Sequence, residues 1–167
     1  MKLNHLIKAG LVAVSVMTLT ACGFGLRGVG NTGVQLAPHH TQVALITDND
    51  AVAFALKPKL STQLAQLGIT TDDTASQHIK ISNLRYREYK LFGVLTEIRL
   101  VLTADVSYQL TDQTHTHTVQ VERSYQYNQA SVATSDQQGE QAKIWLQNSL
   151  AHRIAEQYYT LGRVQNP

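Results

Sequence analysis

A two-residue periodicity over residues 97–110 constrains the fold more than any other feature of the sequence. Apolar side chains there alternate with mostly polar ones, and the apolar positions are Ile98, Leu100, Leu102, Ala104, Val106, Tyr108 and Leu110. Successive side chains of a strand point to opposite faces of a sheet, so the alternation predicts a long, half-buried strand.

Two more long strands are predicted, one before and one after this strand in the sequence. Residues 78–91 alternate with a slip of phase near Asn83, which indicates a strand with a β-bulge, and Phe92-Gly93 is a hairpin-turn candidate. After a polar loop over 111–116, alternation resumes at Val119, Val121, Tyr125 and Tyr127. Three such strands in series predict an antiparallel meander. A fourth, short strand is predicted over 43–46.

Two helices are predicted to accompany these strands. The first carries one apolar face, made of Val52, Leu56, Leu60, Leu64 and Leu67. N-cap candidates precede it at 48–50, and Gly68 follows it where a C′ glycine belongs. Pro58 either kinks this helix or starts it, and we favour one kinked helix. The second helix is predicted over 135–161, with Trp145 widening its apolar face and Gly162 ending it.

The order β-α-β-β-β-α predicts an α+β fold, with two helices packed on one face of a four-stranded, mostly antiparallel sheet. This single domain is expected over 43–162, with a C-terminal tail at 163–167.

The first 21 residues read as a secretion signal. Lys2 and Lys8 precede an uncharged apolar run at 9–20, which is too short to span a membrane. The run ends in Leu19-Thr20-Ala21-Cys22, which resembles the bacterial lipobox. The resemblance implies that Cys22 carries N-acyl and S-diacylglycerol lipid. The residues after it are Gly-rich, so 22–42 is expected to form a lipidated tether. The alternative is an ordinary signal peptide with a chance cysteine.

Composition excludes several classes of function. A single cysteine excludes a disulfide scaffold and a Cys-rich zinc module. Removal of the signal leaves 146 residues (167 − 21) with 12 basic and 12 acidic side chains, because Lys2 and Lys8 are lost. That balance gives no sign of nucleic-acid binding, and it leaves membrane attachment to the lipid anchor, where each buried CH₂ contributes ~0.8 kcal/mol.

No catalytic motif is recognisable, and we predict no enzyme activity, cofactor or metal site. The sequence lacks G-x-S-x-G, P-loop and H-E-x-x-H patterns. His115 and His117 share one strand face and could form half of a metal site, but no third ligand is evident. A solvated hairpin end is the better interpretation of this pair.

Several segments resemble the LPS-assembly lipoprotein LptE family. Residues 22–28 (CGFGLRG) are similar to the family's opening, 95–102 (LTEIRLVL) to its central strand, and 123–128 (RSYQYN) to the stretch that follows. The resemblance extends over most of 22–160 in the same order. It implies a non-enzymatic plug inside the LPS-transport β-barrel LptD, anchored by lipid to the periplasmic face of the outer membrane, which helps the barrel fold and helps insert lipopolysaccharide. The alternative is a stand-alone periplasmic ligand-binding or inhibitor lipoprotein.

The densest basic stretch is the predicted contact for lipopolysaccharide phosphates. Arg85, Arg87 and Lys90 lie in it, and residues 80–99 hold five basic groups against Glu88 and Glu97. Arginine binds phosphate bidentately, which favours this interpretation. Lys143 on the last helix is a weaker candidate. The alternative is a solvated strand face whose cations pair with acids on adjacent strands.

Overall fold

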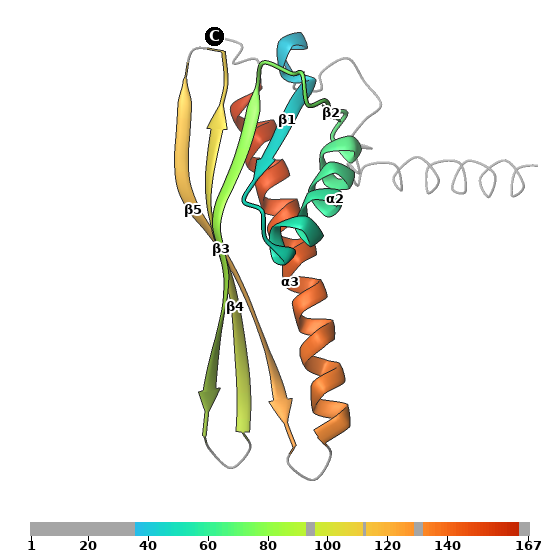
Figure 1. Ribbon diagram of the computed structural model, residues 1–167, viewed down its shortest axis with the longest axis vertical. Helices are drawn as coiled ribbons and strands as arrows, with labels where there is room; N and C mark the ends of the chain where they lie inside the picture. The colour runs from blue at the N-terminus through green and yellow to red at the C-terminus, as the bar shows by residue number, and fades with distance from the viewer. Residues whose placement is uncertain (1–35, 93–95, 112, 129–131, 164–167) are drawn as a thin grey trace, which may run out of the picture. The chain divides into compact units, whose positions relative to one another are not determined.

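The computed structural model describes residues 36–92, 96–111, 113–128 and 132–163, which form an α+β fold (Figure 1). The predicted signal peptide, Cys22 and the tether up to residue 35 lie outside the described residues, as does Gly93 of the predicted hairpin turn.

Five strands form one mixed sheet in the order β2-β1-β3-β4-β5. Their bounds are β1 Gln42–Thr47, β2 Thr70–Thr71, β3 His78–Leu91, β4 Thr96–Gln109 and β5 Thr114–Tyr127. Strands β3, β4 and β5 form the predicted antiparallel meander, whereas β1 pairs in parallel with both β2 and β3.

The prediction of four mostly antiparallel strands is therefore wrong in two respects. It missed β2, whose two residues are too few to show any periodicity. Two backbone hydrogen bonds hold β2 beside β1. Thr70 N donates to Thr41 O at 2.8 Å, and Asp72 N donates to Val43 O at 3.0 Å. It also understated the parallel pairing. A helix connects β1 to β3, and such a crossover makes the two strands run in the same direction.

The predicted bulge in β3 is confirmed at Asn83. The register between β3 and β4 shifts between Ser82 and Arg85, and Asn83 has a φ of 53°. Asn83 donates from its backbone N to the Asp48 carboxylate at 3.0 Å and from Nδ2 to Asp105 Oδ2 at 2.8 Å. An asparagine tolerates this left-handed conformation better than most residues, because its side chain hydrogen-bonds locally.

Helix α2 (Ala51–Gln66) has Asp50 as its N-cap and continues through Pro58. The Asp50 carboxylate accepts a hydrogen bond from Ala53 N at 2.7 Å, as an N-cap does. At the other end Gly68 has a φ of 78°, and Gly68 N and Ile69 N donate to Ala65 O and Leu64 O. These two bonds make a Schellman motif, so the predicted C′ glycine is confirmed.

Helix α3 (Val132–Leu161) packs with α2 on one face of the sheet, as predicted. The core between the layers includes the predicted inner face of β4 and fully buried leucines of both helices. Helix α3 follows the three long strands along most of their length, while α2 and β1 lie beside only one half of them (Figure 1). The β3–β4 hairpin end therefore lies away from α2 and β1 (Figure 1).

The chain enters the fold through a short segment, Leu36–His40, that contacts the end of α3. We call it the N-terminal clasp. Leu36 forms a β-bridge with Arg163, and Ala37 N donates to Gly162 O at 3.1 Å. The Tyr158 hydroxyl donates to His40 O at 3.3 Å. Structure thus begins before Val43, within the segment expected to be tether.

Candidate functional site

The four predicted phosphate-contacting residues lie on two different faces. Arg85 and Arg87 project from β3 on the side away from the helices, since Tyr86 between them is opposite the buried Leu102. Lys90 has the opposite parity and projects toward the helix side of the sheet. Lys143 is on α3. The structure therefore groups the two arginines and separates them from the two lysines.

Arg99 joins the two arginines on the outer face of the sheet. Its partner in the register is Tyr89, and the Arg99 guanidinium lies 5.3 Å from the centre of the Tyr89 ring. Nε of Arg99 is buried and has no hydrogen-bond partner among the described residues. Arg87 lies between the other two arginines. Among the described residues, no carboxylate oxygen lies within 4.0 Å of its guanidinium group. Arg99 belongs to the basic stretch of residues 80–99 but is not among the site residues predicted from the sequence.

Arg85 is more nearly neutralised than the other two arginines. Its Nη1 donates to Asn83 O at 3.1 Å, and Asp105 lies near it on the same face. Hydrogen bonds from Thr118 and Asn83, with the charge of Arg85, lower the pKa of Asp105 below its usual value. Asp105 is therefore ionised at neutral pH and offsets part of the charge of Arg85.

Apolar side chains are exposed where β3 ends, next to these cations. Leu91 is 46% exposed and Phe92 is 82% exposed, and Tyr89 precedes them on the same hairpin arm. We call the set Arg87, Tyr89, Leu91, Phe92 and Arg99 the β3–β4 end. It combines guanidinium groups with an apolar tip, which suits a ligand that is both anionic and apolar.

The two lysines are each paired with an acid. Lys90 Nζ lies 3.8 Å from Glu88, and Lys143 Nζ lies 2.8 Å from Glu140 one helical turn away. The hydrogen bond to Glu140 raises the pKa of Lys143. In both pairs the acid lies on the same element as the lysine, and not on an adjacent strand as the alternative interpretation expects.

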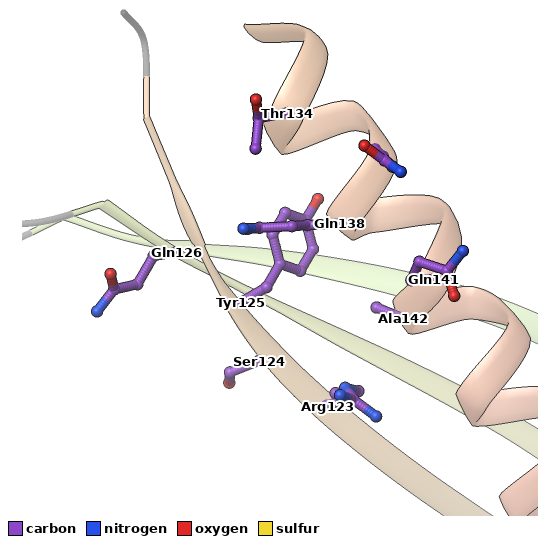
Figure 2. Close-up of a pocket in the computed structure, with 9 residues that line it drawn as sticks. Arg123, Ser124, Tyr125, Gln126, Thr134, Gln138, Gln141 and Ala142 are labelled. Atoms are coloured by element: carbon purple, nitrogen blue, oxygen red, sulfur yellow. The ribbon is translucent and has the colours of Figure 1, made fainter. Parts of the chain in front are cut away.

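A groove of about 660 Å³ lies between β5 and α3 (Figure 2). Tyr125 points from β5 toward α3, whereas Ser124 and Gln126 point away from the helix. Gly139 makes room for the tyrosine, because a Cβ there would lie 3.0 Å from Tyr125 Oη. On the α3 side, glutamines supply much of the lining, at Gln137, Gln138 and Gln141.

His115 and His117, the two histidines considered as half of a metal site, each form a hydrogen bond to a glutamine side chain. His117 Nε2 is 2.8 Å from Gln157 Oε1, which also accepts a bond from the Tyr108 hydroxyl at 2.7 Å. His115 Nε2 is 3.1 Å from Gln113 Oε1. Within the described ranges, no three residues of the usual metal-binding types cluster together. Among the described residues, no helix is both long enough and apolar enough to cross a membrane.

The fold matches solved structures of bacterial lipoproteins. A minor lipoprotein from Acinetobacter baumannii aligns with 79% of this chain and 100% of its own, with 23% identity and a TM-score of 0.66. Rare lipoprotein B from Shewanella oneidensis aligns with 72% of this chain and 95% of its own, with 13% identity and a TM-score of 0.61. Lipoprotein B from Nitrosomonas europaea aligns with 77% of this chain and 92% of its own, with 12% identity and a TM-score of 0.58.

The chain shares the fold of these three solved proteins. The identities to these three structures are low, so the likeness concerns the fold and not the activity. No protein-family model and no curated protein sequence matches the chain.

Proposed function

We propose that the protein is a non-enzymatic lipoprotein of the outer membrane that plugs and helps assemble the LPS-export barrel LptD. In this role the lipid on Cys22 anchors it, and its folded domain sits in the barrel lumen and faces the periplasm. It assists the insertion of lipopolysaccharide into the outer leaflet. The sequence resemblance to the LptE family supports this proposal, and the shared fold with bacterial lipoproteins is consistent with it.

The β3–β4 end is the observation that carries the contact with lipopolysaccharide. Lipid A presents phosphates beside acyl chains, and this part of the protein presents guanidinium groups beside exposed Leu91 and Phe92. Among the described residues, neither Arg87 nor Arg99 has a carboxylate oxygen within 4.0 Å of its guanidinium group. A guanidinium that lacks an acid partner gains more from binding a phosphate than one that is already paired.

The weakly charged surface supports the plug. Asp, Glu, Lys and Arg make up 16% of the chain, against a typical ~25%. Neutral amides line the groove between β5 and α3. Enclosing amides and hydroxyls in a barrel costs less desolvation energy than enclosing charges, provided that hydrogen-bond partners are present.

A pull-down tests the partnership with the barrel. The full-length protein is tagged after Pro167, outer membranes are solubilised in mild detergent, and stoichiometric partners are identified. We expect a large β-barrel that remains bound through high-salt washing, because an interface with little charge depends weakly on salt. Recovery of the lipoprotein alone, in cells that tolerate deletion of its gene, contradicts the proposal.

Paired substitutions test the lipopolysaccharide contact in the same preparation. We expect the double variant Arg87→Ala/Arg99→Ala to bind lipopolysaccharide at least about tenfold more weakly, a difference of ~1.4 kcal/mol, and to retain the barrel. Lys57→Ala is the matched control, since Lys57 is an exposed cation on α2 whose nearest acid is Asp73 at 3.7 Å. Equal binding by the double variant and the control contradicts a role for the β3–β4 end.

A stand-alone periplasmic ligand-binding or inhibitor lipoprotein is the second candidate. The open grooves along β5 and α3 favour it, because a domain that binds small ligands needs such a surface. Absence of a barrel from the pull-down, with a soluble ligand recovered instead, is the outcome that selects it.

A further inference from the structure

Strand β5 forms one edge of the sheet, and half of its backbone hydrogen-bonding groups point away from the sheet. Among the described strands, β5 pairs with β4 alone. At the hairpin Leu110 N donates to Gln113 O, so the alternation of an antiparallel ladder turns the odd-numbered residues of β5 toward β4. The N–H and C=O groups of the even-numbered residues, among them Glu122, Ser124 and Gln126, therefore point outward from the edge.

These outward groups are unpaired along the last part of the strand. Gln120 O accepts a hydrogen bond from Arg153 Nη1 at 2.9 Å. Beyond it, no hydrogen bond from a described residue reaches the outward backbone groups of Glu122, Ser124 or Gln126, and all three residues are exposed. Each of them has one N–H donor and one C=O acceptor that remain available for another strand.

Strand β5 also lacks several features that usually keep an edge strand from pairing with another chain. It has 14 residues, and its register with β4 continues without a shift from Thr114 to Tyr127. Its sequence, THTHTVQVERSYQY, contains no proline and no lysine. Short length, bulges, prolines and lysines are common protections of sheet edges. An edge strand without these four protections is suited to accept a further strand.

Helix α3 runs along this edge and leaves a groove beside it. The groove of Figure 2 is lined by residues 123–126 of β5, and a second groove, of about 820 Å³, is lined by residues 120–122. Successive side chains of a strand point to opposite faces, so a groove that consecutive residues line follows the strand edge. The two grooves meet where the Arg123 guanidinium lies 4.8 Å from the ring centre of Trp145. We call the two together the β5 edge groove.

The helix wall of the β5 edge groove is a stripe along α3. Gln138, Ala142, Trp145 and Ser149 follow one another at steps of four, three and four residues, which places them on one helix face. Trp145, which was expected to widen the apolar face of this helix, is 43% exposed, and Arg123 stacks on its ring. An indole that is held in place and left half exposed is a ready contact surface, because little side-chain entropy remains to be lost on binding.

The charges on the helix side of the groove are positive. Arg123 has the same parity in β5 as the buried Val121, so it projects toward the helices, and Arg153 projects from α3. Among the described residues, no carboxylate oxygen lies within 4.0 Å of either guanidinium group. Glu122 has the opposite parity and projects to the outer face of the sheet. A ligand that faces α3 in this groove is therefore neutral or acidic and not basic.

The dimensions of the groove suit one extended polypeptide segment. Residues 120–126 extend over ~20 Å at about 3.3 Å per residue. The bond from Arg153 to Gln120 O closes one end, so pairing begins at Glu122. A second copy of the chain would bring its own α3 against the same edge, because α3 flanks β5 in every copy. A single segment therefore fits the space beside β5 better than the edge of a second sheet.

We propose that the β5 edge groove binds an extended segment of a partner polypeptide, which adds a strand to the sheet beside β5. The backbone of the segment pairs with Glu122, Ser124 and Gln126. Its side chains that face α3 are neutral or acidic, and an apolar one lies on Trp145. This mode of recognition takes affinity from backbone hydrogen bonds and specificity from alternate side chains. The inference goes beyond the proposed function, since it concerns a surface other than the β3–β4 end and does not require the barrel.

Peptide selection on the purified full-length lipoprotein in detergent tests the proposal. The probe is a displayed library of random peptides of about eight residues, the length that the groove holds. Binding of the selected peptides is measured by calorimetry and by the emission of Trp145, the only tryptophan in the sequence. We expect saturable binding that weakens at least about tenfold when alternate backbone nitrogens of the peptide are methylated in one phase, and that is unchanged in the other phase. A library without a saturable binder overturns the proposal.

Substitutions at Ser124 separate backbone pairing from side-chain contact. Ser124→Pro removes the outward N–H, whereas Ser124→Ala keeps it, and both remove the hydroxyl. The outward N–H makes no bond to β4, and proline is tolerated at such edge positions, so thermal melting should show that both variants fold. We expect Ser124→Pro to bind the selected peptides at least about tenfold more weakly and Ser124→Ala to bind like the wild type. Equal affinity of the two variants overturns the proposal.

Two further measurements complete the test. Gln126→Pro and Gln126→Ala repeat the comparison at the next outward position, where the same difference is expected. Sedimentation of the wild type is expected to show a monomer. A wild-type dimer that Ser124→Pro dissociates would assign the edge to a second copy and overturn the proposal. None of these results depends on the barrel, so failure here and failure of the pull-down are distinguishable.

Discussion

Two glycines of the α3 region differ in what surrounds them, and this difference predicts opposite responses to alanine. A Cβ at Gly162 would lie 3.0 Å from Leu36 Cδ1 and 3.1 Å from His40 Cβ, both in the N-terminal clasp. A Cβ at Gly139 would meet only the far end of the Tyr125 side chain, at 3.0 Å. The clasp must shift in the first case, whereas a tyrosine ring moves by a few tenths of an ångström in the second.

We therefore expect Gly162→Ala to lower the free energy of unfolding by about 1–3 kcal/mol, as overpacking does. Gly139→Ala should leave that free energy unchanged or raise it by up to about 1 kcal/mol, since alanine is the better helix former. Urea denaturation measures both. A Gly162→Ala variant as stable as the wild type would show that the clasp yields without cost.

His40 predicts how stability depends on pH. The residue is buried, its Nδ1 makes no hydrogen bond among the described residues, and burial followed by the nearby His39 lowers its pKa from the ordinary 6.5. Below pH 6.5 the unfolded chain binds a proton at His40 that the folded chain resists. The free energy of unfolding therefore decreases as the pH is lowered, until the pH is below the pKa of His40 in the folded protein. In denaturant titrations at several pH values, we expect His40→Leu to lose less stability than the wild type between pH 7 and 5. The exposed His152→Gln should behave like the wild type, and a His40→Leu slope equal to the wild-type slope would contradict the prediction.

At the level of single residues, the face of β3 on which each cation lies could be predicted from the two-residue period of a strand. Arg85 and Arg87 are two apart and Lys90 is three beyond Arg87, so the sequence alone indicates that the lysine lies on the other face. The exposure of Trp145 could not be predicted from the sequence. A tryptophan beside an apolar helical stripe is usually counted with the core, and only the packing of α3 against β5 shows that it borders a groove.

At the level of elements, the start of α2 yields a clean test of the N-cap. Asp50 accepts a hydrogen bond from Ala53 N at 2.7 Å, and removing it leaves that amide without its cap. We expect Asp50→Ala to cost about 1 kcal/mol of stability. Asn49→Ala is the control, because Asn49 is exposed and makes no side-chain hydrogen bond to a described residue. Thermal melts of both variants measure the effect, and equal loss in the two would mean that the cap contributes nothing.

The elements that sequence predicted well are those with local signals. The alternation in β4, the apolar stripe of α2 and the Gly68 cap each depend on residues within one or two turns or strand repeats of one another. Strand β2 has no such signal, because its pairing depends on β1, and the paired residues are 28 positions apart in the sequence (70 − 42 and 71 − 43). The parallel pairing of β1 likewise follows from how the crossover is routed, which no local pattern encodes.

At the scale of the whole molecule, the N-terminal clasp joins the start of the fold to its end. Leu36 and His40 pack on Gly162, and Tyr158, which is fully buried, donates to His40 O. In the proposed role this segment lies between the lipid anchor and the domain. A tether that ends in a docked segment holds the domain closer to its anchor than a free tether of the same length.

Truncation tests how much the clasp contributes. We compare a chain that begins at Leu36 with one that begins at Thr41. The shorter chain loses the bond from Ala37 N to Gly162 O, the bond to His40 O and the packing of Leu36. Each hydrogen bond contributes about 1 kcal/mol. Leu36 is only partly buried and contributes less than the about 1.5–3 kcal/mol of a fully buried leucine, so we expect a total loss of roughly 2–4 kcal/mol. Differential scanning calorimetry should show a lower melting temperature for the chain beginning at Thr41. Identical melting temperatures would mean that Leu36–His40 does not stabilise the domain, and the clasp would then be mechanically no different from the rest of the tether.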